Sequence, residues 1–249
     1  MFSHIYEMKS ISELVEEKLA KKGKPIDYLA VHKSDSKRFG LDSVKVSEVN
    51  VKEVKLALEQ LDVVFPETLP EVIKDTISTT NNIKALMYLI GAVKEKTGSS
   101  FTGPEATGNE LTLVPLEESE LPDGSIYPGQ AEHVFRQSLT AGKYDYMGTS
   151  VNQIKVDRQK GMIIFGFLEL VPNPIIDTIQ LKKGGTEYPS QEYNIELFKK
   201  VNFYRLPRPY TFPPDTQFCI RVQAKYDGIS ELRPVGLVVK RADESTKLY

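Results

Sequence analysis

The chain has 249 residues, of which 40% are hydrophobic and 27% are charged, as is typical of a soluble globular protein. Its formal net charge of −2 excludes a general electrostatic attraction to nucleic acid. It does not exclude a local basic patch. The single cysteine, Cys219, excludes an intrachain disulfide and any metal site that needs several cysteines.

Residues 1–97 are predicted to form a small helical region. Met1–Ser10 lacks the apolar stretch of a secretory signal. Ser10 and Glu13 then have the spacing of a capping box, and apolar residues follow on one helical face until Gly23. No apolar run reaches the roughly 20 residues that a membrane-spanning helix needs, so we expect a soluble protein.

Two more helices follow from the same rules. Asn50 and Glu53 repeat the capping-box pattern, and Pro66 limits the helix that they begin. Pro70 suits the first position of a third, short helix that ends near Thr79.

The fourth predicted helix has the clearest pattern. Asn81 or Asn82 caps it, and Gly98 ends it. We interpret its apolar stripe as core packing within a small bundle, with docking onto a partner as the alternative. The stripe consists of Ile83, Leu86, Met87, Ile90 and Val93.

Residues 98–109 are predicted to be a linker, because small and polar residues dominate them. Residues 110–249 read as short strands between Gly and Pro turns, without the alternating helices of a parallel sheet. The fold class is therefore α+β, with the helical region followed by an antiparallel β-sandwich. The strand candidates are 110–114, 132–140, 143–149, 151–157, 161–171, 175–182, 193–206, 217–227 and 233–241.

Two of these segments and two of the turns beside them carry further predictions. Residues 218–226 alternate between apolar and polar side chains, which predicts one dry and one wet face. Asp227-Gly228 is predicted to close a hairpin with the strand that follows. Residues 161–171 are apolar on both faces, so we place this strand centrally. Lys182–Gly185 is predicted to be another turn.

The sequence predicts no catalytic residue, cofactor site or metal site, and we expect no enzyme. Neither His4 nor His32 has a partner at metal-binding spacing, and Cys219 lies inside a strand as an inert thiol. The G-x-S-x-G, P-loop and G-x-G-x-x-G patterns are missing. If the chain is an enzyme, its candidates are His133, Glu132 and Asp157.

Two aromatic or proline-rich segments are candidate contact surfaces. Tyr144 and Tyr146 could present rings to a sugar or a partner, but we favour a strand half-buried on the core. Leu206–Pro214 has the density of a polyproline ligand, but we favour a rigid connection between two strands. Arg205 and Arg208 beside it are candidates for anion binding, with rim salt bridges as the commoner reading.

The part from residue 161 to 242 resembles the latter strands of a viral jelly roll. This resemblance rests on Ile175–Leu181 with the turn Gly184-Gly185, on Phe212–Val222, and on Leu232–Val239. It implies a jelly-roll-like sandwich and a capsid, penton or cement protein of a bacterial or archaeal virus. The partners would be copies of the chain and other structural proteins. The location would be the virion, assembled in the host cytoplasm; outside this resemblance we expect a cytoplasmic protein.

Two alternatives remain. Residues 220–240 also resemble the closing strands of tailed-phage major capsid proteins, although those place a hairpin arm and one long helix before the strands. Outside the viral reading, a carbohydrate- or protein-binding β-sandwich module would use Tyr144, Tyr146 and the sandwich loops. Neither reading implies a cofactor, specific nucleic-acid recognition or an integral membrane protein.

Overall fold

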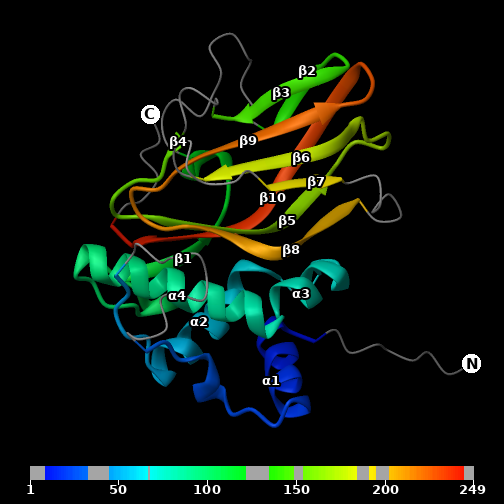
Figure 1. Ribbon diagram of the computed structural model, residues 1–249. Coiled ribbons are helices and arrows are strands. Elements are labelled where there is room, and N and C mark those ends of the chain that lie inside the picture. Colours follow the sequence, from blue (N-terminus) through cyan, green and yellow to red (C-terminus); the bar gives the residue numbers. More distant parts are fainter. Residues whose placement is uncertain are drawn as a thin grey trace, which may run out of the picture.

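The computed structural model describes residues 9–32, 45–66, 68–121, 135–148, 154–183, 191–194 and 202–243. Within these ranges, helices come first along the chain and two antiparallel sheets follow, packed face to face as a sandwich (Figure 1). The α+β prediction is therefore confirmed. The helices are α1 (Ile11–Lys21), α2 (Val51–Val64), α3 (Glu71–Ile77) and α4 (Thr80–Thr97).

Both predicted capping boxes are confirmed. At the start of α1, the Ser10 hydroxyl accepts a hydrogen bond from the Glu13 amide, and the Glu13 carboxylate accepts one from the Ser10 amide. Asn50 and Glu53 make the same exchange at the start of α2. Each box satisfies backbone amides that the first helical turn leaves without partners.

The predicted end of α4 is confirmed, but its predicted start is wrong. Gly98 ends the helix in the left-handed conformation, at φ 71°. The helix begins at Thr80 after Thr79, so neither Asn81 nor Asn82 caps it. Asn82 is instead buried, and its side-chain amide donates to the Thr76 carbonyl at 2.8 Å, which joins α4 to α3.

The two sheets have an interleaved strand order. In the first sheet the order is β1-β10-β5-β8, with β2 also paired to β10; in the second it is β3-β9-β6-β7, with β4 also paired to β9. Every pairing is antiparallel. The strands are β1 (Leu111–Pro115), β2 (Arg136–Leu139), β3 (Gly142–Met147), β4 (Ile154–Lys155), β5 (Gly161–Glu169), β6 (Ile176–Lys183), β7 (Gln191–Asn194), β8 (Phe203–Phe212), β9 (Gln217–Ala224) and β10 (Gly228–Arg241).

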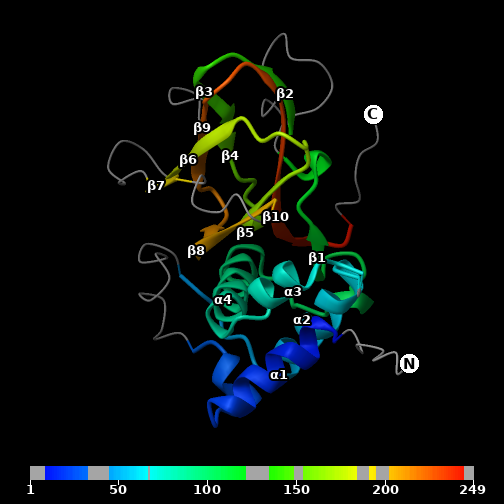
Figure 2. The ribbon, with the colours of Figure 1, turned by 90° about the vertical axis from the view of Figure 1, so that its right-hand side faces the viewer.

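The central position predicted for residues 161–171 is confirmed, because β5 lies between β10 and β8. Its two faces enter two different apolar clusters. Ile163 and Phe165 pack with the helices, whereas Met162, Ile164 and Phe167 pack between the two sheets. Figures 1 and 2 show the helices gathered on the outer side of the first sheet, away from the second. The helices thus cover an apolar sheet face that would otherwise meet water.

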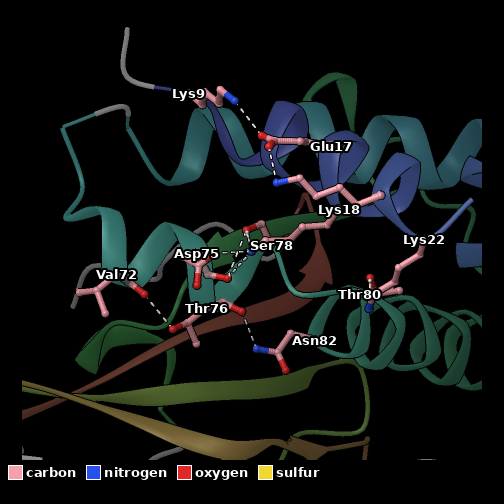
Figure 3. Close-up of polar contacts among 11 residues, drawn as sticks. Lys9, Glu17, Lys18, Lys22, Val72, Asp75, Thr76, Ser78, Thr80 and Asn82 are labelled. Carbon is pink, nitrogen blue, oxygen red and sulfur yellow. Dashed lines mark hydrogen bonds and ion pairs between the residues drawn. The ribbon is translucent and has the colours of Figure 1, made fainter. Parts of the chain in front are cut away.

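Polar contacts join the helices to one another (Figure 3). The Lys18 ammonium of α1 forms an ion pair with the Asp75 carboxylate of α3 at 2.6 Å. It also donates to the Asp75 carbonyl at 2.7 Å and to the Ser78 hydroxyl at 2.8 Å. One side chain of α1 therefore satisfies acceptors at the C-terminal end of α3, where a positive charge is favourable.

The predicted hairpin at Asp227-Gly228 is wrong. The strands on its two sides, β9 and β10, belong to different sheets, because β9 pairs with β3, β4 and β6 while β10 pairs with β1, β2 and β5. The connection crosses from one sheet to the other, and the Asp227 carboxylate accepts a hydrogen bond from the Ala141 amide at 2.8 Å. A short turn in the sequence signals a reversal of direction but does not identify the strand that pairs.

The rigid connection predicted at Leu206–Pro214 is also wrong in its extent, since β8 continues through Pro207 and Pro209 to Phe212. β8 lies at the edge of the first sheet, where a residue without an amide hydrogen is tolerated. Its register against β5 shifts between Ile164 and Gly166, which lie opposite Tyr210 and Arg205. The extra residues 206–209 therefore form a bulge that contains both prolines.

The division into 1–97, 98–109 and 110–249 stays a prediction, but the helices and the first sheet share one apolar cluster. This cluster includes Phe101, from the segment predicted as the linker, which is buried and forms a bridge with Leu111. Of the other predicted turns, Lys182–Gly185 extends outside the described residues.

Replacing Phe165 with alanine should destabilise helices and sandwich together. Phe165 is fully buried in the shared cluster, so Phe165→Ala should lower the free energy of unfolding by about 3–5 kcal/mol. Hydrogen-exchange mass spectrometry in denaturant reads helical and strand peptides separately, and both sets should lose protection at the same lower midpoint. The control Val63→Ala, at a side chain of α2 that is 73% exposed, should change little. Separate midpoints would contradict a shared core.

Candidate functional site

The structure does not bring the three enzyme candidates together among its described residues. His133 and Glu132 lie outside those residues. Asp157 is exposed in the turn between β4 and β5, where its carboxylate accepts a hydrogen bond from the Gln159 amide at 2.7 Å. Aspartate side chains commonly stabilise turns by accepting a hydrogen bond from the backbone amide two residues further on.

The remaining candidate side chains are those of His4, His32 and Cys219. His4 lies outside the described residues, and His32 is exposed after the short 3₁₀ helix at Ile26–Leu29. Cys219 is fully buried in β9, and burial raises the pKa of its thiol. A buried thiol with a raised pKa is a poor nucleophile, which agrees with the inert role expected for it.

The aromatic pair on β3 does not form an open aromatic surface. Tyr146 is fully buried, and its hydroxyl donates to the Leu232 carbonyl at 2.7 Å while accepting from the Leu232 amide at 3.2 Å. Tyr144 is half-buried, and its hydroxyl accepts from the Thr140 amide at 3.2 Å. Tyr146 therefore ties β3 to β10 and offers no ring to a ligand.

Arg205 and Arg208 are both exposed on the edge strand β8. Arg208 lies within the proline bulge, and Arg205 lies just before it. The structure thus places both arginines at one edge of the first sheet.

A buried carboxylate that the sequence analysis did not single out lies at the end of β5. Glu169 is fully buried, and it accepts hydrogen bonds from the Ser230 hydroxyl at 3.1 Å and from the Glu231 amide at 2.9 Å. Burial raises its pKa, and the hydrogen bonds oppose this shift in part. The signal in the sequence was a single acid near the end of a long apolar run.

Glu169 belongs to a polar cluster that joins four strands. The Tyr146 hydroxyl of β3 also lies within hydrogen-bond distance of the Phe135 carbonyl beside β2, so its one hydrogen is shared between this carbonyl and that of Leu232. Burial raises the pKa of the Tyr146 phenol, with the Glu169 charge contributing. Gln137 of β2 donates to the Tyr146 carbonyl at 3.2 Å. Satisfied polar groups of this kind fix the relative positions of strands, because any slip leaves a buried group without its partner.

Directly beside this cluster, one end of the sandwich exposes three large apolar side chains. Leu170, Tyr226 and Ile229 are 44%, 59% and 48% exposed, respectively. They come from the β5–β6 and β9–β10 connections and from the start of β10, which lie at the same end in Figure 1, at the upper right. The Lys225 amide donates to the Ile175 carbonyl at 2.7 Å, so the two connections are in contact.

Charged side chains flank these apolar residues. Glu231 forms ion pairs with Arg233 at 2.8 Å and with Arg136 at 3.8 Å, and both arginine side chains are more than half exposed. We call this surface the distal rim and define it as Leu170, Tyr226, Ile229, Arg136, Glu231 and Arg233. Exposed apolar groups beside arginine are typical of protein–protein contact surfaces.

Comparisons with protein-family models, with curated proteins and with solved structures give no match for this chain. Among the described residues, no group of three or more His, Cys, Asp or Glu side chains is placed to hold a metal ion. The described helices include none with the length and apolar character required to cross a bilayer.

Replacing Glu169 with glutamine should reduce the pH dependence of stability. Because folding raises the pKa of Glu169 above its ordinary value of 4.5, its stabilising contribution is complete below that value and is lost as the pH rises through the folded-state pKa. Glutamine does not ionise, so Glu169→Gln should gain stability relative to the natural chain between about pH 5 and about pH 8.

The measurement is urea denaturation across this pH range. The matched control is Glu59→Gln, which changes an exposed glutamate on α2 and should keep the pH profile of the natural chain. A Glu169→Gln variant whose stability falls with rising pH as steeply as that of the natural chain would show that the Glu169 charge has no such effect.

Proposed function

We propose that this chain is a non-enzymatic structural protein built on a jelly roll, and that it assembles with copies of itself and with other structural proteins in a virion. The observation that carries the proposal is the strand order. β1 and β2 both pair with β10, so we count them as one strand position, and we count β3 and β4 as one because both pair with β9. The described strands then occupy eight positions, numbered one to eight in sequence order. The first sheet has the order 1-8-3-6 and the second 2-7-4-5, which is the strand order expected of a jelly roll.

Jelly rolls also occur in lectins and in cupins, so the strand order does not by itself select a function. A ligand bound inside the sandwich would need space between the sheets. Here that region contains tightly packed large side chains, with Phe212 and Phe218 at a ring separation of 4.3 Å. The arrangement therefore favours surface contacts over a ligand held in the interior.

The distal rim supplies a surface suited to such contacts. Its apolar residues lie on or directly beside strand ends that the buried Glu169 and Tyr146 cluster holds in register, which favours a surface that is ordered before it meets a partner. A rigid surface loses less conformational entropy on binding. An assembly repeats each modest interface many times, so even a weak contact of this kind stabilises a large particle.

The proposal is tested by the mass of the full chain in solution. Size-exclusion chromatography with light scattering, run over increasing concentration and followed by negative-stain electron microscopy, should give species well above the 28.1 kDa of one chain. Rings or closed particles would support a shell component. A strict monomer at every concentration, with and without molecular crowding, would contradict the proposal.

Replacing Ile229 with glutamate should weaken assembly through the distal rim. Ile229→Glu would place a charge where an apolar contact is proposed, and we expect about a tenfold or greater increase in the concentration needed for assembly. The control Val63→Glu changes a more exposed valine on α2 and should assemble like the natural chain. Unchanged circular dichroism would show that both variants fold, and equal assembly of the two would remove the distal rim from the proposal.

A further inference from the structure

The outward face of the second sheet carries a polar hollow that none of the contacts described so far uses. The hollow is open to solvent, and it lies over the adjacent strands β3, β9 and β6. Helices cover the outer face of the first sheet (Figure 1), whereas the strands that carry the hollow belong to the second sheet. Its lining residues are Lys143, Thr178, Gln180, Arg221, Val222 and Gln223.

The strand register explains why these side chains gather. Lys143 of β3 lies opposite Gln223 of β9, which in turn lies opposite Thr178 of β6. The next row with the same orientation contains Arg221 opposite Gln180, since side chains two residues apart share a face. Two rows of polar side chains from three strands thus surround one hollow, above the buried backbone of Val222.

The lining is rich in hydrogen-bond donors and positive charge. Lys143 and Arg221 are cationic, the two glutamines carry amide groups, and Thr178 carries a hydroxyl. No lining residue is acidic. Asp145, next to the hollow, pairs with the Nε group of Arg221 and holds the guanidinium in place, while the Arg221 side chain stays one-third exposed. This pair leaves the lining with a net positive charge.

We propose that this hollow is a binding site for a small oxyanion, that is, a phosphate or carboxylate group. Guanidinium, ammonium and amide donors around one shallow space match the acceptor oxygens of such a group. The net charge of Lys143, Arg221 and Asp145 favours an anion over a neutral ligand. The site does not depend on the proposed assembly.

The test is a heteronuclear NMR titration of the full chain with sodium phosphate and, separately, with sodium acetate, at an ionic strength held constant with sodium chloride. We expect saturable shifts of the Gln180 and Gln223 side-chain amides, with a dissociation constant of about 1 mM. Saturation by phosphate alone identifies a phosphate-type ligand, by acetate alone a carboxylate, and by both a general oxyanion site.

Two matched variants decide whether binding occurs in the hollow. Lys143→Gln removes an exposed lining charge and should weaken binding about tenfold. Lys155→Gln removes a lysine of the same sheet, on β4 outside the lining, and should leave the affinity unchanged. The absence of saturable shifts with either anion, or equal weakening by the two variants, would overturn the proposal.

Discussion

The central strand β5 of the first sheet is buried on both faces, and the rest of the structure depends on this double burial. One face meets the second sheet, and the other meets the helices, so the residues of β5 alternate between two apolar clusters. The alternation changes phase at the bulge, so that Ile164 and Phe167 face the same cluster, and Gly166 and Gly236 allow the close backbone approach there. Removing either covering layer would expose a wide apolar surface to water.

The features that the sequence predicted well are local ones. The capping boxes of Ser10 and Asn50 and the end of α4 at Gly98 depend on neighbouring residues alone, so their patterns sufficed. The central position of β5 could also be predicted, because only a strand covered on both faces is apolar on both. The predicted cap of α4 was wrong because Asn82, a residue type that often caps helices, instead donates its side-chain amide to a carbonyl of α3.

The errors and omissions are non-local. Asp227-Gly228 turns the chain, but pairing partners come from segments far away in sequence. The cluster around Glu169 joins residues that no spacing rule connects, and the hollow around Arg221 needs three strands in a particular register. Periodicity gives the face on which a side chain lies, but not the neighbours that it meets there.

The strand order also has a consequence for biosynthesis. β10, the last of the described strands along the chain, lies between β1 and β5 and contributes Leu237 and Val239 to the cluster beneath the helices. A nascent chain therefore cannot complete this sheet until translation has passed residue 239. Until then, the apolar side chains of β1 and β5 lack the strand that lies between them. Unpaired apolar strands are prone to aggregate, so we expect β1 and β5 to need chaperones, or rapid pairing with β10 once it is synthesised.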